Sequence, residues 1–240
     1  MDIKKHIDTH GWIILEKFLD KEITEQLQLH ARSQVGIKGQ AISGNWYNPD
    51  HHPDDYKTAI EEGIDWAHYW TGQLQGSEHT VINQVKQKIA PIIDQLLDQW
   101  HWWCVDYHVA CPGSEYIHAH MDTPYQFEPW SLYKSLLGVQ ILIAVDDFTI
   151  ENGATSFVPN SHIKDFDIDK INKKYYNDYL LENSQQFVAS AGSILLYHPR
   201  LLHSTMPNYS NQNRHALLIN TVHHSIIEEL KKYDTNCYSG

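Results

Sequence analysis

The chain has 240 residues, of which 42% are hydrophobic and 20% are charged, proportions that are ordinary for a globular protein and exclude a disordered chain. Lysine and arginine number 18 against 30 aspartates and glutamates, so the net charge is −12. This acidic balance argues against nucleic acid and anionic membranes as partners. No apolar stretch approaches the roughly 18 to 20 residues that a membrane-spanning helix needs. The basic start has no apolar segment behind it, and the three cysteines lack metal-binding or redox spacing, so we expect a reduced, cytoplasmic protein.

The N-terminal part of the chain predicts a strand, helices and a long loop. An apolar run after Gly11 indicates a short strand, and Asp20 is a suitable N-cap for a helix because apolar residues recur behind it at helical spacing. The polar and aromatic segment Asn45–Tyr56 is typical of an irregular loop, and we expect it to form a lid. A second helix is expected to begin near Ser77 and to be interrupted by Pro91.

From Trp100 onward the pattern changes to short strands. The apolar run Leu137–Val145 predicts a fully buried strand, and Ile168–Leu181 predicts a helical insertion. Further strands are expected at Glu115–His120, Thr155–Val158, Phe187–Ala189, Ile194–Tyr197, Leu201–Met206 and His215–Val222. Short strands joined by tight turns favour a jelly roll, so the expected fold class is mainly β with flanking helices.

We expect a single domain over residues 1–240. Its N-terminal layer, residues 1–99, would hold the first strand, the helices and the lid loop. The β core would span residues 100–224, and residues 225–240 would form a C-terminal tail. Neither an internal repeat nor an interdomain linker is visible in the sequence.

The segment His118-Ala-His120-Met-Asp122 carries the main chemical signal. Alternate residues of a strand share a face, so His120 and Asp122 would offer a nitrogen and a carboxylate oxygen side by side. His203, on a late strand, is the candidate third ligand. Two histidines and one carboxylate on one face are the facial triad of non-haem Fe(II) oxygenases, which leaves open positions for co-substrate and oxygen.

Arg214 adds a second signal. It follows His203 by eleven residues, which would place it on the neighbouring strand across the turn Asn208–Asn213. A guanidinium at that place could bind a carboxylate through two parallel hydrogen bonds.

Four sequence blocks, in order along nearly the whole chain, resemble the phytanoyl-CoA dioxygenase-like family of Fe(II)- and 2-oxoglutarate-dependent oxygenases. They are HGWIILEKFLDKEI, ACPGSEYIHAHMD, VDDFTIENGATSFVPNSH and AGSILLYHPRLLHSTMPNYSNQNRHALLINT. The third block departs slightly from the family's usual Pro-Gly-Ser-His, because Asn160 stands where glycine is usual. The resemblance implies a double-stranded β-helix fold, in agreement with the expected strands.

The resemblance also implies roles for particular residues. His120, Asp122 and His203 would bind Fe(II), and Arg214 would bind the distal carboxylate of 2-oxoglutarate. Thr205 would lie on the same face as His203 and could add a hydroxyl to that carboxylate. Two weaker candidates for co-substrate contacts are Gln140 and Tyr107, for which a purely structural role is equally compatible with the sequence.

The reaction implied by the resemblance consumes O2 and 2-oxoglutarate and releases succinate and CO2. Halogenating relatives carry a small residue in place of the carboxylate ligand, so Asp122 favours hydroxylation or desaturation. We expect a small-molecule substrate, with no nucleic acid or membrane partner, and a monomer or small homo-oligomer. Tyr125, Phe127 and Trp130 could line a pocket for a cationic metabolite.

Two alternative readings stay open on the sequence. His118 and His120 also match the HxH motif of a cupin metal site, but Pro124 and Tyr125 stand where a cupin would offer its glutamate. A catalytically silent module that senses 2-oxoglutarate or metal is the second alternative. Such modules tend to lose a ligand or the arginine, and here all four residues are present.

Overall fold

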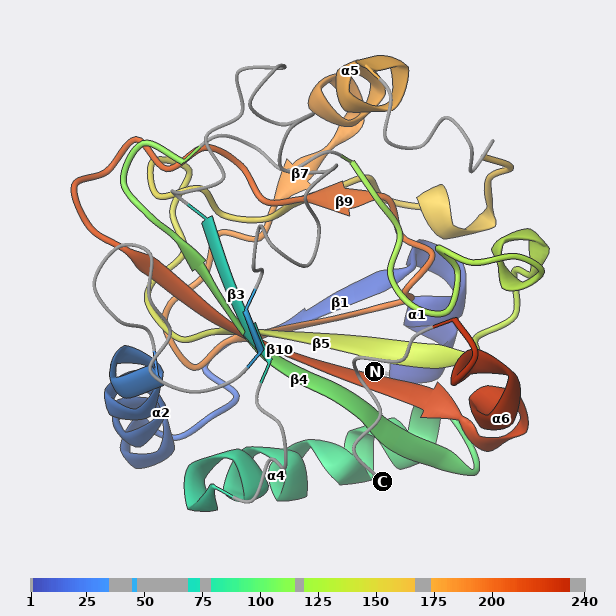
Figure 1. Cartoon of the computed structure of the whole chain (residues 1–240), viewed down its shortest axis with the longest axis horizontal. Coiled ribbons are helices and arrows are strands. Elements are labelled where there is room, and N and C mark those ends of the chain that lie inside the picture. Colours follow the sequence, from blue (N-terminus) through green and yellow to red (C-terminus); the bar gives the residue numbers. More distant parts are fainter. Residues whose placement is uncertain are drawn as a thin grey trace.

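Two antiparallel sheets form the centre of the computed structural model, which describes residues 2–34, 45–46, 69–73, 79–114, 119–166 and 174–233 (Figure 1). Among these residues the larger sheet has seven strands in the order β1-β8-β5-β10-β4-β3-β2, and the smaller has three in the order β7-β6-β9. The strands of the larger sheet are β1 (Trp12–Leu15), β2 (Asn45–Trp46), β3 (Tyr69–Gln73), β4 (Trp100–Ala110), β5 (Gly138–Ala144), β8 (Ile194–Tyr197) and β10 (Arg214–His223). Those of the smaller sheet are β6 (Ser156–Phe157), β7 (Gln185–Gln186) and β9 (His203–Ser204).

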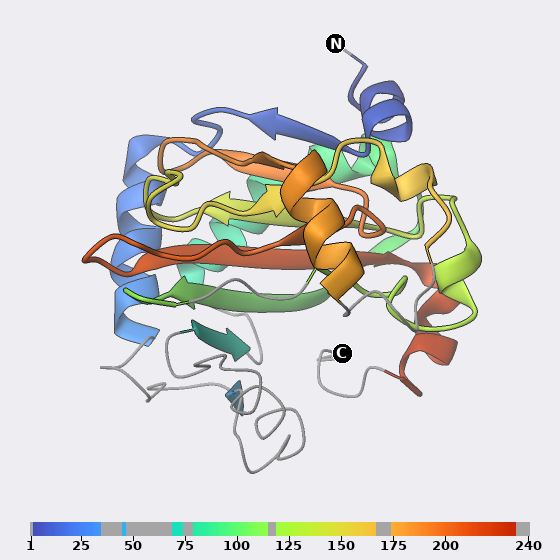
Figure 2. The same ribbon diagram turned by 90° about the horizontal axis from the view of Figure 1, so that it is seen from above.

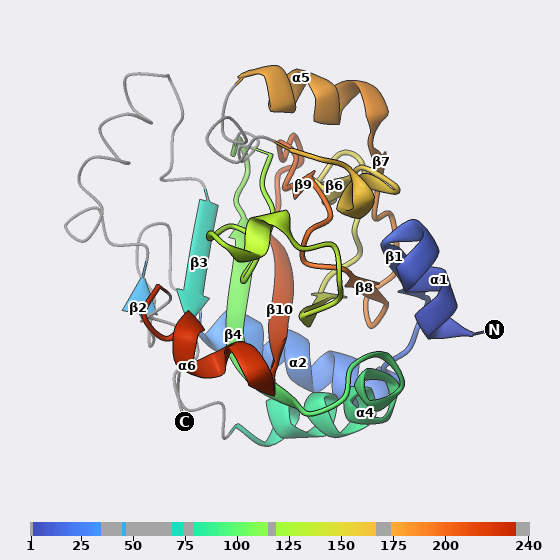
Figure 3. The same ribbon diagram turned by 90° about the vertical axis from the view of Figure 1, so that its right-hand side faces the viewer.

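Helices cover one face of the larger sheet. Figures 1 and 3 show α2 (Lys21–Gln34) and α4 (Thr80–Leu96) along this face, with α5 (Lys174–Asn183) on the opposite side of the molecule. Helix α1 (Ile3–His10) lies beside β1 (Figure 2). The expected N-cap is confirmed, because the Asp20 carboxylate accepts a hydrogen bond from the Ile23 backbone N–H at 3.0 Å.

The interruption expected at Pro91 is wrong. Helix α4 runs through this residue from Thr80 to Leu96. The proline lies on the exposed side of the helix, and the apolar side chains before and after it, such as Ile89 and Ile93, are fully buried against the sheet. Burial of one continuous apolar face outweighs the backbone hydrogen bond that proline cannot donate.

Side chains alternate between the two faces of the larger sheet, so each face contributes to a separate hydrophobic core. Ile141 and Ile143 of β5 point toward the helices and join an outer core with α2 and α4. Leu142 and Ala144 point the other way and join an inner core with Phe157 of the smaller sheet. We call this second side the inner face of the seven-stranded sheet. It is where a jelly roll holds its ligands, and the expected fold class is confirmed.

Several elements differ in length from the expectation. The smaller sheet uses two-residue strands, so the predicted strand Leu201–Met206 shrinks to β9 and Phe187–Ala189 lies just after β7. The expected C-terminal tail begins with helical turns, η5 (His224–Ile226) and α6 (Ile227–Leu230). Apart from β2, the expected lid Asn45–Tyr56 lies outside the described residues, as does most of the predicted strand at 115–120. In the described part of the chain, no helix combines the length and apolar character needed to cross a membrane.

Candidate metal centre

A single antiparallel bridge brings His120 and His203 together. The backbone N–H of His120 donates to the His203 carbonyl at 3.0 Å, and the N–H of His203 donates to the His120 carbonyl at 3.1 Å. Directly paired residues share a face, so the two imidazole rings lie together with their centroids 4.2 Å apart. The segment His120-Met121-Asp122, called the HxD segment below, is thus attached to β9, the edge strand of the smaller sheet.

Asp122 completes the cluster. Its Oδ1 lies 3.8 Å from Nε2 of His120, and its Oδ2 lies 3.3 Å from Nε2 of His203. Its backbone N–H donates to the Pro199 carbonyl at 2.8 Å, which fixes the carboxylate beside the end of β8. The three ligand atoms all lie within 4.8 Å of one another. Two imidazole nitrogens and one carboxylate oxygen at this spacing fit a divalent metal ion with open coordination positions.

Hydrogen bonds around the three candidate ligands set their orientation. Nδ1 of His203 lies 2.8 Å from the Leu201 carbonyl and donates to it, so the proton stays on Nδ1 and the Nε2 lone pair faces Asp122. The Tyr197 hydroxyl donates to Oδ2 of Asp122 at 2.8 Å and lies 3.4 Å from Nε2 of His203. A metal site gains affinity from such supporting bonds because its ligands need no reorganisation on binding.

Arg214 lies at the start of β10 with its side chain 1% exposed. Its Nη2 donates to the Gly153 carbonyl at 2.9 Å, and its guanidinium carbon lies 4.4 Å from the centre of the Phe148 ring. The carbonyl is presented by a turn that requires glycine, because Gly153 has a φ of +79° and an added Cβ would come within 2.3 Å of the Met206 carbonyl oxygen. A buried guanidinium held over a ring and by a backbone carbonyl presents a fixed fork that suits a carboxylate.

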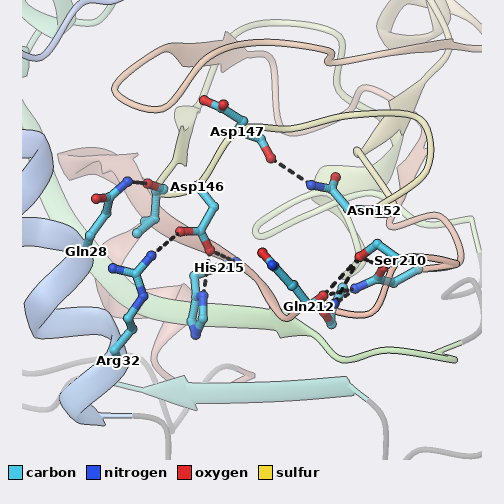
Figure 4. Close-up of polar contacts among 11 residues, drawn as sticks. Gln28, Arg32, Asp146, Asp147, Asn152, Ser210, Gln212 and His215 are labelled. Atoms are coloured by element: carbon cyan, nitrogen blue, oxygen red, sulfur yellow. Dashed lines mark hydrogen bonds and ion pairs between the residues drawn. The ribbon is translucent and has the colours of Figure 1, made fainter.

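Asp146 anchors the same end of β10, as Figure 4 shows. Its Oδ2 accepts from the backbone N–H of His215 at 2.9 Å and from Nδ1 of that residue at 2.6 Å, while Oδ1 accepts from Arg32 at 2.9 Å. Burial opposes ionisation of Asp146, yet these hydrogen bonds hold the pKa of its carboxyl below the ordinary value. A polar groove of about 1120 Å³ separates this anchor from the loop at 209–213. His215 and Arg214 are neighbours on the strand, so the groove lies on the face opposite to the guanidinium.

Tyr107 was expected to contact the co-substrate, but its side chain points away from the candidate metal centre. Tyr107 points to the helix-covered face of β4, where its hydroxyl lies 2.8 Å from Nδ1 of His30 and burial raises its pKa. The other two candidates are on the inner side. Thr205 is buried two residues after His203, and Gln140 faces the interior opposite Tyr197 on the adjoining strand.

His108 is a site residue that the sequence pattern did not single out. It lies on the inner face of β4, opposite Ala216. Burial lowers its pKa to about 4; Asp122 acts to raise it, while Arg214 and the two histidines of the triad lower it. The imidazole is therefore neutral and lies within the electrostatic reach of both the triad and the arginine. Strand alternation could have grouped His108 with Asp106 and separated both from Tyr107, although the sequence does not say which face is inner.

The aromatic pocket wall expected after the HxD motif is wrong in part. The Tyr125 hydroxyl is buried, donates to the Ser135 carbonyl and accepts from the Leu137 N–H at 2.8 Å, so it ties two loops together. Trp130 packs in a core cluster with Trp103. His118 lies outside the described residues.

Comparison with known proteins gives a family match and a set of structural neighbours. The family model described as phytanoyl-CoA dioxygenase (PhyH) matches residues 7–216. Dioxygenase lolE1 of Epichloe uncinata is 30% identical over 108 residues, which are 44% of this chain and 40% of that protein. The aligned stretch thus spans less than half of this curated relative.

Two solved structures show the same fold at low sequence identity. HygX from Streptomyces hygroscopicus, with nickel and 2-oxoglutarate bound, has a TM-score of 0.67 at 11% identity and covers 92% of this chain and 85% of its own. The non-heme alpha ketoglutarate dependent carbocyclase SnoK from nogalamycin biosynthesis has a TM-score of 0.66 at 17% identity, covering 92% and 82%.

Proposed function

Because the chain belongs to the phytanoyl-CoA dioxygenase (PhyH) family, we propose that it is an Fe(II)- and 2-oxoglutarate-dependent oxygenase that hydroxylates a small molecule. The observation that carries this proposal is the convergence of His120, Asp122 and His203, whose ligand atoms lie within 4.8 Å of one another. Such a donor set is typical of ferrous oxygenases.

The residues present fit both the metal and the co-substrate. His120 and His203 would bind Fe(II) through Nε2, and Asp122 through one carboxylate oxygen. Fe(II) carries a charge of +2 and the Asp122 carboxylate a charge of −1, so the metal with its protein ligands has a net charge of +1. This charge suits a dianionic 2-oxoglutarate. Arg214 would bind the far carboxylate of 2-oxoglutarate, and the Thr205 hydroxyl would add a hydrogen bond. Fe(II), 2-oxoglutarate and O2, when bound together, would supply an oxidant for an unactivated C–H bond, and 2-oxoglutarate would be converted to succinate and CO2.

The protein's own contribution is orientation and shielding. Tyr197 fixes the Asp122 carboxylate, and the Leu201 carbonyl fixes the His203 ring. Phe148 and the Gly153 carbonyl hold the guanidinium of Arg214 away from water. Since Asp122 occupies the third ligand position, the outcome we propose is hydroxylation or desaturation and not halogen transfer.

The proposal also covers the class of substrate, the domain organisation, the compartment and the oligomeric state. HygX has also been solved with hygromycin B bound, which is a small molecule, and we propose that this chain too acts on a small molecule. We further propose that residues 1–240 act as one domain, in the cytoplasm, as a monomer or small homo-oligomer.

Substrate-free turnover tests this function without knowledge of the substrate. Protein loaded anaerobically with Fe(II) and 2-oxoglutarate should form succinate slowly once O2 is admitted, which a catalytically silent sensor would not do. His120→Ala and Asp122→Ala should abolish both metal binding and succinate formation. His101→Ala, an exposed histidine paired with His224, serves as the matched control and should change neither. An Asp122→Ala protein with unimpaired succinate formation would refute the assignment.

A further inference from the structure

A row of polar side chains crosses the inner face of the seven-stranded sheet at the end away from Arg214. Its members stand in register across β4, β10, β5 and β8, and they are Cys104, Asn220, Gln140 and Tyr197. Directly paired residues have Cβ atoms about 4.5 to 5.5 Å apart, so the amides of Gln140 and Asn220 lie side by side. Asp106 follows Cys104 on the same face of β4, and the Cys104 thiol lies 3.0 Å from its carboxylate.

The two amides carry acceptors that the described part of the protein does not satisfy. Gln140 is 1% exposed and Asn220 is 5% exposed. Oε1 of Gln140 and Oδ1 of Asn220 have no hydrogen-bond partner among the described residues. A buried acceptor without a donor is costly, and two adjacent ones double the cost. Such a pair is explained when a ligand brings the missing donors.

2-Oxoglutarate is not that ligand, because its dianion carries no hydrogen-bond donor and the carboxylate that Arg214 would hold lies far from the row. Arg214 and Asn220 are six residues apart on β10, which corresponds to about 20 Å along the strand at ~3.3 Å per residue. Gln140 pairs with Asn220 and lies at the same remote end. Gln140 is therefore too far from Arg214 to share the carboxylate that this arginine would bind, and a contact with the metal-bound end of 2-oxoglutarate stays a prediction.

The row nevertheless adjoins the metal centre. Tyr197 stands next to Gln140 in the row, and its hydroxyl reaches Asp122 at 2.8 Å. On the other flank, His108 is the next inward-facing residue after Asp106 on β4 and lies within the electrostatic reach of the triad. A molecule whose polar group binds this row would thus present the carbons next to that group to the metal, from the side opposite to Arg214.

The chemistry of the row selects hydrogen-bond donors with positive charge. Gln140 and Asn220 offer carbonyl oxygens, and Asp106 offers a carboxylate. Asp106 is the diagonal neighbour of Asn220, so about 7 to 8 Å separates their Cα positions and one functional group can contact both side chains. An ammonium group donates up to three hydrogen bonds and pairs with a carboxylate, whereas a second anion would be repelled.

We propose that Asp106, Gln140 and Asn220 form the substrate subsite and that the substrate is a small metabolite with a protonated amino group. The amine binds the three acceptors, and the oxidised C–H bond belongs to a carbon close to it. This inference rests on the proposed oxygenase function and adds the class of substrate to it.

Thermal stabilisation by amines tests the subsite. The full chain is loaded with Ni(II), which does not turn over, and with 2-oxoglutarate, and its Tm is followed with ethanolamine, putrescine, lysine, glucosamine and 2-deoxystreptamine. Each amine is paired with its N-acetylated form, which keeps the carbon skeleton but loses the charge. At least one amine should raise the Tm in a saturable way, and its acetylated form should not. Loss of a charge-assisted hydrogen bond in Asp106→Asn should raise the half-saturating amine concentration about tenfold or more.

A double variant, Gln140→Met with Asn220→Leu, should have the same effect on amine binding. Apolar groups of similar shape replace acceptors without partners in this variant, so folding is expected to be preserved. If it does not fold, the near-isosteric Asp106→Asn still decides the question. The matched control is Gln84→Met in α4, which removes another buried carbonyl oxygen without a described partner, but outside the inner face. This control should leave amine binding unchanged.

Three results would overturn the subsite: no amine stabilises the protein, the acetylated forms stabilise it equally, or the amine shift survives unchanged in Asp106→Asn and in the double variant. The shift produced by Ni(II) and 2-oxoglutarate alone is measured first and tests the oxygenase function separately. If that first shift is absent, both proposals fail. If it is present without an amine effect, only the subsite fails.

Discussion

The hydroxyl of Tyr197 donates a hydrogen bond to Oδ2 of Asp122 at 2.8 Å and lies 3.4 Å from Nε2 of His203. A side chain of the seven-stranded sheet thus contacts two of the proposed metal ligands, which belong to other segments, the HxD loop and β9. Because the phenol engages Oδ2, the carboxylate cannot rotate freely, and Oδ1 keeps its place 3.8 Å from His120. We therefore expect Tyr197 to act as a positioning residue for the proposed metal centre.

Tyr197→Phe should weaken metal binding without unfolding the protein. Loss of a supporting hydrogen bond to a ligand typically costs 10- to 100-fold in metal affinity, and we expect a loss of about this size for Co(II) or Ni(II), measured by titration calorimetry. The visible spectrum of the Co(II) complex should also change, which a purely structural effect would not cause. Tyr107→Phe is the control, because that hydroxyl pairs with His30 on the other face of the sheet. Equal affinities in the two variants would contradict the role of Tyr197.

Arg214 should determine 2-oxoglutarate affinity. Arg214→Ala removes the fork that the Gly153 carbonyl and Phe148 hold in place. We expect a loss of about 2 to 4 kcal/mol, or roughly thirty- to a thousand-fold in the KM for 2-oxoglutarate, with metal binding little changed. Arg214→Lys keeps the charge but loses the two parallel hydrogen bonds, so its KM for 2-oxoglutarate should lie between those of the wild type and Arg214→Ala. Steady-state succinate formation measures both variants.

The control for Arg214 is a second arginine at the same end of β10. Arg32 donates to Asp146 at 2.9 Å from the far side of the strand, and its side chain is largely exposed. Arg32→Ala should leave the KM for 2-oxoglutarate at the wild-type value. A normal KM in a folded, metal-binding Arg214→Ala protein would show that Arg214 is structural instead.

The sequence predicted the elements whose signal is local and periodic. Strand β8 begins and ends as expected at Ile194 and Tyr197, and the run expected to form a fully buried strand contains β5, all of whose residues are buried. Asn160, where the family usually has glycine, adopts a φ of +60°, a conformation that asparagine tolerates, so this departure leaves the turn intact.

Features that depend on three-dimensional pairing could not be predicted. The HxD segment was expected to lie in a strand, but among the described residues His120 joins the smaller sheet through one bridge to His203. The inner face of β4 could not be predicted either, because alternation groups Cys104, Asp106 and His108 on one face of the strand without indicating which face points inward. The sequence therefore gives Tyr107 as a candidate and does not single out His108. The pairing of Gln140 with Asn220 likewise depends on a register that only the folded sheet reveals.

Gly153→Ala should damage the arginine site through the backbone. The residue has a φ of +79°, and a Cβ would meet the Met206 carbonyl oxygen at 2.3 Å, so the turn must shift and the carbonyl that holds Arg214 must move. We expect a stability loss of about 1 to 3 kcal/mol, together with a raised KM for 2-oxoglutarate. Chemical denaturation and succinate kinetics measure the two effects.

Gly113→Ala is the matched control for this substitution. Gly113 has a similar φ of +78°, but no atom lies within 4 Å of the position where its Cβ would be. It therefore carries the backbone strain of a left-handed alanine without the steric clash. A KM effect of the same size in both variants would mean that general strain, and not the Gly153 carbonyl, is responsible.

The last prediction concerns Asp146 and pH. The folded-state pKa of this carboxyl lies below its ordinary value, despite burial, because His215 and Arg32 donate hydrogen bonds to it. A carboxyl with a depressed pKa stabilises the fold fully above its unfolded-state pKa of about 3.9, and that stabilisation is lost as the pH falls through the folded-state value. Asp146→Asn removes the charge and should lower the free energy of unfolding at pH 7 by about 1.5 to 3 kcal/mol.

Urea denaturation of both proteins between pH 7 and pH 2.5 measures this contribution. The difference in unfolding free energy should be constant from pH 7 to about pH 5 and should shrink below about pH 4, because the wild-type carboxyl then becomes protonated and neutral as well. Asp147→Asn, at the exposed neighbouring position, controls for the loss of one acidic residue and should show a smaller difference at pH 7. If the gap for Asp146→Asn stayed constant down to pH 2.5, its charge would not be what anchors this end of β10, and shape alone would hold His215 and the adjoining Arg214 in place.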